Sequence, residues 1–342
     1  MSDAPAGVDL DSVSRWLVAN VDGVELPLRC SLISGGRSNL TYRIDDAAGR
    51  TLVLRRPPLG NVLATAHDMG REWRIISALA GTPVPVAPAV AWCPDESVNG
   101  APFYVMGYVE GLILDTAGAA SKVDEAARKA AGTDMVTVMA ALHAIEPDDV
   151  GLGTLGRRED YIGRQLRRWH QQWEKSKTRE LPAVDEVHRR LSTGIPPQQR
   201  SGIVHGDFRL GNMMVGPDGR IRAVLDWELA TLGDVLADLG WMLSSWTEPG
   251  EAPDVPGAPP TTAPGFPSRA EMTGRYERLT GLDLSSIAWY VAFARWRSVC
   301  ITEGVYARYK AGVMGGDDFD FEAFDAQIQR TAAAALAALE TL

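Results

Sequence analysis

Three polar side chains stand at spacings that suit phosphoryl transfer. Asp207 and Asn212 are five residues apart, and Asp226 follows fourteen residues later, at the end of the apolar run 221–225. Transfer of a phosphoryl group needs a carboxylate to accept the proton of the attacking hydroxyl, and oxygen ligands to hold Mg²⁺ against the phosphates. We therefore expect Asp207 to be the general base, and Asn212 and Asp226 to bind Mg²⁺.

Two short apolar runs, 213–215 and 221–225, surround a Gly-Pro-Asp-Gly turn at 216–219 and predict a β-hairpin. Such a hairpin would bring Asn212 and Asp226 close enough to share a metal ion. The tripeptide His-Gly-Asp at 205–207 is less specific, because Asp also caps turns and Gly supplies positive φ in ordinary loops. His205 is open to two interpretations, a brace for this loop or a direct role in the chemistry.

The order H-x-D-x-x-x-x-N, followed by an Asp at a strand end, is similar to the protein-kinase signature. Gly206 stands in place of the usual Arg, and Trp227-Glu228 in place of Phe-Gly. In this form the chain resembles the aminoglycoside phosphotransferase family, the small-molecule branch of the protein-kinase-like fold, over about residues 32–308. Within the family, the Leu-Arg-Arg-Pro-Pro stretch at 54–58 is most similar to the phosphotransferase part of acyl-CoA dehydrogenase fusion proteins.

The resemblance implies an α+β fold with two lobes: a small β-rich N-lobe with one main helix, and a larger, mostly helical C-lobe. We expect the nucleotide-binding lobe at residues 1–108, and the catalytic and substrate-binding lobe at 109–342. Hydrophobic patterning agrees with this division. It predicts strands near 30–34, 39–44, 51–55, 89–93 and 103–109, a helix over 68–79, and mainly helices beyond residue 111.

A nucleotide site is also implied by the resemblance, because kinases cover the phosphates with a Gly-rich loop between two strands. The corresponding stretch here contains Gly35, Gly36, Ser38 and Asn39, whose backbone N–H groups and side chains could hold a phosphate. A Gly pair is also what any hairpin uses. By the same resemblance, the backbone from Met106 to Tyr108 would contact adenine at the hinge between the lobes.

Kinases place a Lys on the third strand to hold the α- and β-phosphates, but this chain has no Lys before Lys122. The matching position is Arg55, whose planar guanidinium can bind phosphate but does not simply replace Lys. Its implied partner is Glu72, on the helix over 68–79. The alternative is an ordinary surface Arg–Glu pair.

Composition excludes several classes of partner. The chain of 342 residues has 34 basic and 44 acidic residues, a formal charge of −10, which disfavours a nucleic-acid partner. No run approaches about 18 apolar residues, and no basic-then-apolar leader is visible, so we expect a cytoplasmic protein without a membrane partner. The three cysteines are isolated and indicate reduced thiols. The oligomeric state stays open.

The acceptor is harder to predict. The helices expected to form the substrate pocket are rich in aromatic residues and arginine, which favours a partly apolar substrate, or one with a carboxylate or phosphate, over a polycation. The alternative is that the aromatic residues form the core of a helical lobe. The residues concerned are Trp169, Trp173, Trp289, Tyr290, Arg295, Trp296, Arg297 and Tyr306.

The sequence therefore predicts a phosphotransferase that uses ATP and Mg²⁺ to phosphorylate a hydroxyl of a small molecule. A nucleotide-binding pseudokinase or scaffold is the alternative from another class, since Arg55 replaces the usual Lys and Glu228 follows the metal motif. Among enzymes, a hydroxyacyl-CoA kinase is the alternative suggested by the branch resemblance. A protein kinase is disfavoured because no Ala-Pro-Glu segment follows Asp226.

Overall fold

The chain forms two compact units in a computed structural model, which describes residues 5–35, 39–60, 68–251, 258–313 and 319–340. The first unit comprises residues 1–110 together with 222–228, and the second comprises 111–221 and 229–342. The short segment that carries Asp226 thus belongs with the N-terminal residues. A functional boundary between residues 108 and 109 stays a prediction.

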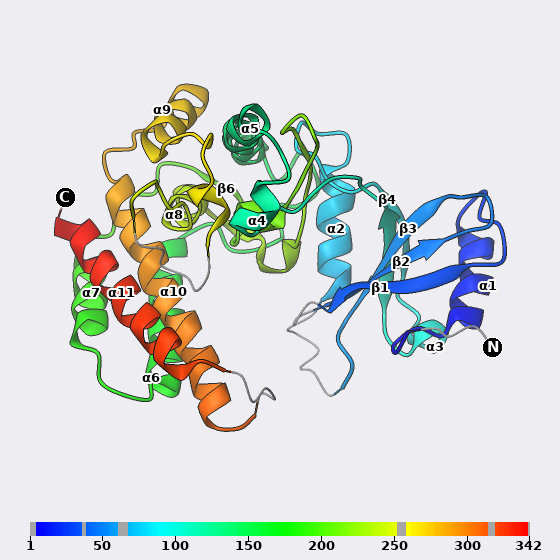
Figure 1. Cartoon of the computed structure of the whole chain (residues 1–342), viewed down its shortest axis with the longest axis horizontal. Coiled ribbons are helices and arrows are strands. Elements are labelled where there is room, and N and C mark those ends of the chain that lie inside the picture. Colours follow the sequence, from blue (N-terminus) through cyan, green and yellow to red (C-terminus); the bar gives the residue numbers. More distant parts are fainter. Residues whose placement is uncertain (1–4, 36–38, 61–67, 252–257, 314–318, 341–342) are drawn as a thin grey trace. The chain divides into compact units, whose positions relative to one another are not determined.

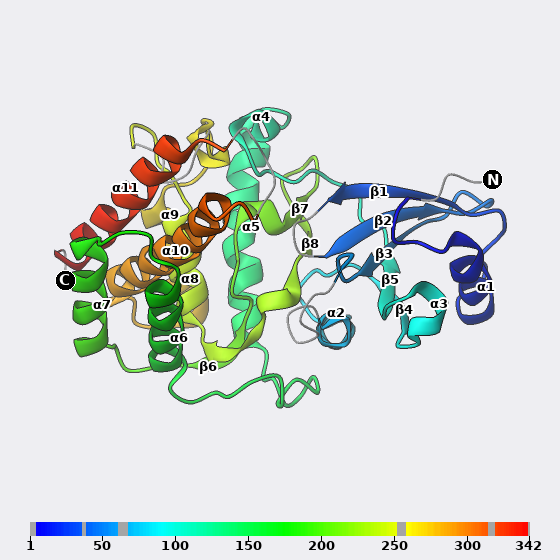
Figure 2. The same ribbon diagram turned by 90° about the horizontal axis from the view of Figure 1, so that it is seen from below.

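The first unit is built on a five-stranded antiparallel sheet (Figure 1), whose strand order is β1-β2-β3-β5-β4 (Figure 2). Its strands are β1 (Arg29–Gly35), β2 (Leu40–Asp45), β3 (Thr51–Arg56), β4 (Ala89–Cys93) and β5 (Phe103–Gly107). Its helices are α1 (Leu10–Asn20), α2 (Met69–Leu79) and the short α3 (Glu96–Asn99). The observed strands begin within one residue of the predicted positions, and β5 ends two residues earlier than predicted.

The two faces of this sheet have different roles because side chains alternate along a strand. Leu52 and Leu54 of β3 join a buried apolar cluster with Val13 and Leu17 of α1. Arg55 follows Leu54 directly, so its side chain belongs to the opposite face of the sheet, and it pairs in register with Tyr104 of β5. Since α2 contacts β4 and β5, one face of the sheet carries the apolar core and the other directs polar side chains toward α2.

The second unit is mainly helical (Figure 2). Its helices are α4 (Ala117–Ala120), α5 (Glu125–Ala144), α6 (Tyr161–Ser176), α7 (Pro182–Thr193), α8 (Leu236–Ser244), α9 (Arg269–Thr280), α10 (Ile287–Lys310) and α11 (Phe321–Glu340). Short strands lie among them: β6 (Ser201–Val204), β7 (Met213–Val215), β8 (Ile221–Val224, which continues into the first unit) and β9 (Thr231–Asp234). The expected α+β class is confirmed.

Helix α10 is the centre of the second unit. It packs against α6, α7, α8 and α11, so it buries side chains on every face instead of along one stripe. This placement decides between the two interpretations of the C-terminal aromatic residues. Trp173, Trp289, Tyr290 and Trp296 are buried core residues, so the prediction that they line the substrate pocket is wrong.

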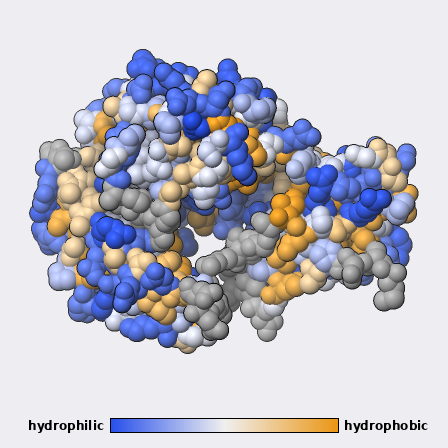
Figure 3. Space-filling model, viewed as in Figure 1, coloured by the Kyte–Doolittle hydropathy of each residue, from blue (hydrophilic) through white to orange (hydrophobic). Residues whose placement is uncertain are grey.

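The surface of the second unit shows no broad apolar area on the face seen in Figure 3, where hydrophilic side chains separate small hydrophobic groups. Among the residues that the structure describes, no helix is both long enough and apolar enough to cross a membrane.

The crossing of α8 and α10 depends on Gly240, because a Cβ there would come within 2.6 Å of the carbonyl oxygen of Tyr290. We expect Gly240→Ala to lower the free energy of unfolding by about 1–3 kcal/mol, since the helices must move apart. The control is Gly274→Ala in α9, where a Cβ would meet only the end of the Arg278 side chain, at 3.3 Å. That change should be neutral or stabilise by up to about 1 kcal/mol. Urea unfolding of both variants tests this, and equal midpoints would contradict the close packing.

Candidate functional site

The loop that carries Asp207 leaves β6 through a tight turn. Gly206 has φ of +85°, and a Cβ on it would lie 3.0 Å from the carbonyl oxygen of Leu229. Both the backbone conformation and the lack of space therefore require glycine at this position. His205 is fully buried, and its Nδ1 accepts a hydrogen bond from the backbone N–H of Asp207 at 3.2 Å. In this structure His205 braces the loop.

A buried carboxylate, that of Asp238, anchors the same loop. Asp238 of α8 accepts hydrogen bonds from the backbone N–H groups of His205 (2.6 Å) and Gly206 (2.8 Å). His143 of α5 lies 3.4 Å from the same carboxylate, and its other ring nitrogen is 2.7 Å from the hydroxyl of Tyr276. Burial disfavours the charge on Asp238, but the contacts with His143 and the loop outweigh it and lower the pKa of Asp238 below its ordinary value.

The carboxylate of Asp207 is held at both oxygens. Its Oδ2 accepts from the side-chain amide of Asn212 at 2.7 Å, and its Oδ1 accepts from the indole N–H of Trp241 at 2.7 Å. Arg209 adds a longer contact, 3.2 Å from its Nε to each oxygen. The Asn212 amide also donates to the backbone carbonyl of Asp207 at 2.8 Å. The two residues predicted from their spacing thus lie in direct contact.

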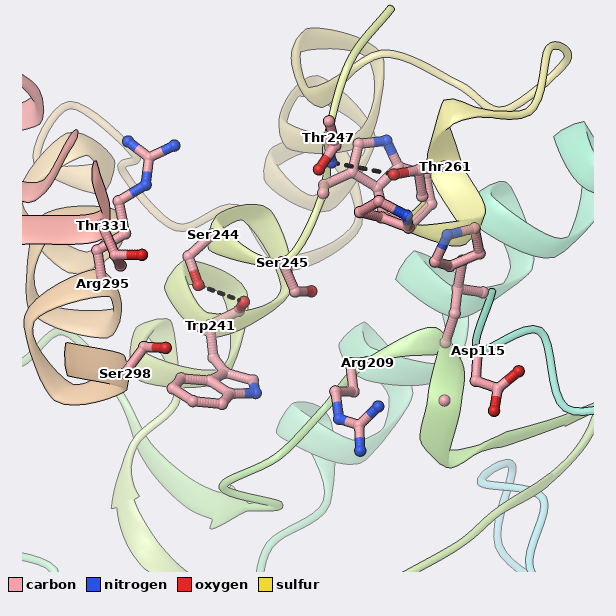
Figure 4. Close-up of a pocket in the computed structure, with 15 residues that line it drawn as sticks. Asp115, Arg209, Trp241, Ser244, Ser245, Thr247, Thr261, Arg295, Ser298 and Thr331 are labelled. Carbon is pink, nitrogen blue, oxygen red and sulfur yellow. Dashed lines mark hydrogen bonds between the residues drawn. The ribbon is translucent and has the colours of Figure 1, made fainter. Parts of the chain in front are cut away.

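A pocket of about 270 Å³ opens beside this carboxylate within the second unit. Arg209 and Trp241, which both contact Asp207, are part of its wall (Figure 4). Arg295 of α10 and Asp115 are the other charged residues that line it. Much of the rest is hydroxyl-bearing: Ser244, Ser245, Thr247, Thr261, Ser298 and Thr331. Of the residues predicted to line the substrate pocket, only Arg295 lines this pocket.

The first unit contains a second polar cluster, centred on Glu72. Arg55 lies 2.9 Å from Glu72, the hydroxyl of Tyr104 donates to the same oxygen at 2.9 Å, and Asn39 donates to the other oxygen at 2.6 Å. The side chain of Glu72 is 3% exposed and that of Arg55 is 14% exposed, so this is a buried pair and not a surface one. Burial raises the pKa of Glu72, although Arg55 and Tyr104 oppose the shift.

Asp226 joins this cluster through Arg55, whose Nη2 donates to its Oδ1 at 2.6 Å. Burial favours the neutral form of Arg55, yet the carboxylates of Glu72 and Asp226 outweigh it and raise the pKa of Arg55. Asp226 has φ of +64°, which is uncommon for a residue other than glycine and points to a conformation held by its surroundings. Asn212 belongs to the other unit, so a metal ion shared by Asn212 and Asp226 stays a prediction.

The remaining predicted nucleotide contacts are distributed along the sheet. Gly35 ends β1 and pairs with Leu40, whereas Gly36 and Ser38 lie outside the described residues. Met106 pairs with Val53 of β3, and Tyr108 is 40% exposed. Asn39 is buried, and its side-chain amide donates to Glu72, so its observed role is within the polar cluster centred on Glu72.

Asn212 and Asp226 each carry oxygen atoms of the kind that Mg²⁺ binds. The amide nitrogen of Asn212 donates to Asp207, so the amide oxygen is the atom that would bind an ion. In proteins, Mg²⁺ is often bound by one or two protein oxygens together with phosphate oxygens of the substrate. Among the described residues, no three His, Cys, Asp or Glu side chains cluster as a possible metal site.

Sequence reasoning missed three residues of these clusters: Tyr104, Arg209 and Trp241. Arg297 was expected to line the substrate pocket, but it is 7% exposed and donates to the carbonyl oxygen of Gly206 at 2.8 Å. Only Arg209 lies within the recognised motif. The contacts of Tyr104, Trp241 and Arg297 depend on how strands and helices pack, and no local pattern marks them.

Comparison with known proteins gives consistent matches. A model of the phosphotransferase enzyme family matches residues 29–260. Mouse (Mus musculus) acyl-CoA dehydrogenase family member 10 is 36% identical over 290 residues, which cover 84% of this chain and 27% of that protein. The chain spans well under half the length of the curated relatives it matches.

Solved structures match over nearly the whole chain. A protein of Ralstonia eutropha JMP134, provisionally named an aminoglycoside phosphotransferase, is 34% identical with a TM-score of 0.82, covering 98% of this chain and 99% of that one. The ADP-bound aminoglycoside phosphotransferase APH(2″)-Ib is 16% identical with a TM-score of 0.56, covering 97% and 99%. At that identity the similarity concerns the fold alone.

The buried pair in the first unit gives a stability prediction. We expect Arg55→Met to lower the free energy of unfolding by about 3–5 kcal/mol, because it leaves the buried carboxylate of Glu72 without its cation. Arg43→Met is the matched control, since the Arg43–Asp45 pair on the same sheet is 40% and 36% exposed and should contribute only about 0–1 kcal/mol. Thermal and urea unfolding measure both, and equal losses would contradict the burial of the Arg55 pair.

Proposed function

Because the chain belongs to the phosphotransferase enzyme family, we propose that it transfers the γ-phosphate of ATP to a hydroxyl of a small molecule, with Asp207 as the general base. The observation that carries the proposal is the carboxylate of Asp207, held at both oxygens beside a pocket in the same unit. A base must be fixed within reach of the hydroxyl that it deprotonates.

In the proposed reaction, the acceptor hydroxyl oxygen forms a bond to the γ-phosphorus while the bond from that phosphorus to the ADP oxygen breaks. The hydroxyl proton passes to Asp207. Positioning and charge stabilisation account for most of the catalysis in such reactions. Asn212 supports both, since its amide nitrogen orients Asp207 and its oxygen is available as a ligand.

The nucleotide would be bound by the first unit. Arg55 is the cation proposed to hold the phosphates, positioned by Glu72 and Tyr104. Asn212 and Asp226 would hold Mg²⁺, which when bound neutralises charge on the phosphates. Complexes with ADP and with GDP are known for phosphotransferases of the same fold, which supports a purine nucleotide here.

The pocket beside Asp207 is the proposed acceptor site. It has two arginines against one carboxylate, and several hydroxyl groups. A polycation would be repelled by Arg209 and Arg295. A carboxylate or phosphate on the acceptor would pair with these arginines, and a neutral hydroxylated acceptor would not be repelled. The name of the Ralstonia relative therefore does not by itself predict an aminoglycoside as the acceptor.

A hydroxyacyl-CoA is a second candidate acceptor. The mouse relative is named an acyl-CoA dehydrogenase family member, and the pocket arginines Arg209 and Arg295 suit the phosphates of CoA. This alternative changes the acceptor and leaves the role of Asp207 as proposed.

Incubation of the purified protein with γ-labelled ATP, Mg²⁺ and a metabolite extract should give a labelled small molecule. Asp207→Ala should lower the rate of labelling by at least about 100-fold, because the proton acceptor is lost. Asp185→Ala is the matched control, because it also removes a carboxylate but at an exposed position of α7 outside the pocket, and it should retain labelling.

Other outcomes separate the alternatives. Full turnover by Asp207→Ala would overturn its role as base. Mg²⁺-dependent ATP binding without transfer to any acceptor, including a set of hydroxyacyl-CoA esters, would favour the pseudokinase. No nucleotide binding at all would reject the proposed function.

The charge of the pocket gives a separate prediction. Arg295→Gln should raise KM for an anionic acceptor by about 10-fold or more, because a charge-assisted hydrogen bond contributes about 1.5–3 kcal/mol. Arg330→Gln on the exposed side of α11 changes the net charge equally but does not line the pocket. Steady-state kinetics compare the two variants, and an unchanged KM in Arg295→Gln would show that the acceptor does not use this arginine.

A further inference from the structure

The strongest contact of Asp207 outside its own loop comes from a tryptophan. The indole Nε1–H of Trp241, on α8, donates to Oδ1 of Asp207 at 2.7 Å, across a sequence separation of 34 residues. This bond matches the 2.7 Å bond from Asn212 to the other oxygen. Because an indole N–H can only donate, the contact fixes which atom of Asp207 faces α8.

Trp241 is itself held in place by a buried arginine. The guanidinium of Arg297, from α10, lies 4.4 Å from the centre of the Trp241 ring and 5.4 Å from that of Trp169. A cation over an aromatic face is attracted to it, and the attraction grows where water is excluded. Arg297 also donates to the carbonyl oxygen of Gly206 at 2.8 Å, so one side chain touches both the indole and the loop that carries Asp207.

Two donors are needed because a carboxylate rotates easily about its last bond. Without Trp241, Asn212 would fix Oδ2, and only the longer 3.2 Å contact of Arg209 would hold Oδ1. With Trp241 on Oδ1, a short hydrogen bond at each oxygen sets the plane of the group. Trp241 also lines the pocket, next to Arg209 and Ser244, so the residue that orients the carboxylate is part of the proposed acceptor site (Figure 4).

We propose that Trp241 is a positioning residue for the general base: its indole N–H fixes the carboxylate plane of Asp207, and Arg297 fixes the indole. The kinetic part of this inference rests on the proposed function. The hydrogen bond itself does not, and it can be tested without any substrate.

The kinetic test is Trp241→Phe in the full-length protein. Phe keeps an aromatic face for Arg297 and removes only the N–H donor and part of the ring. We expect kcat to fall between about 10- and 100-fold, because a misplaced catalytic group costs that much, and KM for ATP to stay within twofold. A change confined to KM for the acceptor would overturn the proposal, since Trp241 would then only shape the pocket.

The control is Trp296→Phe, which also removes a buried indole donor, here from the carbonyl oxygen of Val184 at 3.2 Å. It lies in the core of the second unit and contacts neither Asp207 nor the pocket. Its kcat, corrected for the folded fraction, should stay within twofold. An equal loss in both variants would assign the effect to general packing and overturn the positioning role.

The substrate-free test follows the indole proton by NMR in protein labelled with ¹⁵N-tryptophan, which has ten indole groups. The Trp241 resonance is the one missing from Trp241→Phe. In Asp207→Ala it should move upfield more than any other indole resonance, because its charged acceptor is removed. An unmoved resonance would overturn the proposal. A moved resonance in a protein that transfers no phosphate would uphold the contact while the proposed function fails.

Discussion

The arrangement of the catalytic loop in the second unit depends on the hydrogen bonds that the buried carboxylate of Asp238 accepts. It accepts two backbone N–H groups from the turn at His205 and Gly206, so the loop is anchored by a side chain of α8. The same helix carries Trp241 one turn further on, where it reaches Asp207. One helix therefore fixes the backbone of the loop and the orientation of its carboxylate, and the packing of α8 against α10 keeps both aligned.

The first unit uses a buried charge in a similar way. Glu72 of α2 is contacted by Arg55 of β3, Tyr104 of β5 and Asn39, which directly precedes β2. A buried acid is tolerated only when its oxygens are satisfied, so removing any member leaves a cost for the others. Both clusters thus place a cation or a carboxylate at a defined point and hold it there through several hydrogen-bonded or ion-paired partners.

The features that could be predicted from the sequence are contacts between residues close along the chain and periodic secondary structure. The contact of Asp207 with Asn212 spans five residues and is made by a single turn. The capping pattern of Ser268 and Glu271 at the start of α9 was also present, although the helix was not predicted from it.

Packing between distant elements could not be predicted. Helix α10 is buried around most of its circumference, and its buried residues include the polar Arg297 and Glu303, so its pattern gives no single apolar stripe. Three of its aromatic residues were assigned to a pocket although they form the core: Trp289, Tyr290 and Trp296. The partners of Trp241 and Tyr104 depend on helix and strand positions that no spacing encodes. Gly36 and Ser38 lie outside the described residues, and their predicted phosphate contacts stay predictions.

The first unit is formed by two separate segments of the chain, and this affects when it can fold during synthesis. Arg55 and its partner Asp226 are 171 residues apart, and segment 222–228 is part of the same unit as residues 1–110. A chain emerging from the ribosome therefore presents the sheet and α2 long before it can supply Asp226. During that interval, Arg55 can pair with Glu72 but lacks its second carboxylate partner, Asp226. The first unit can therefore complete its ion pairs only after residue 226 has been synthesised.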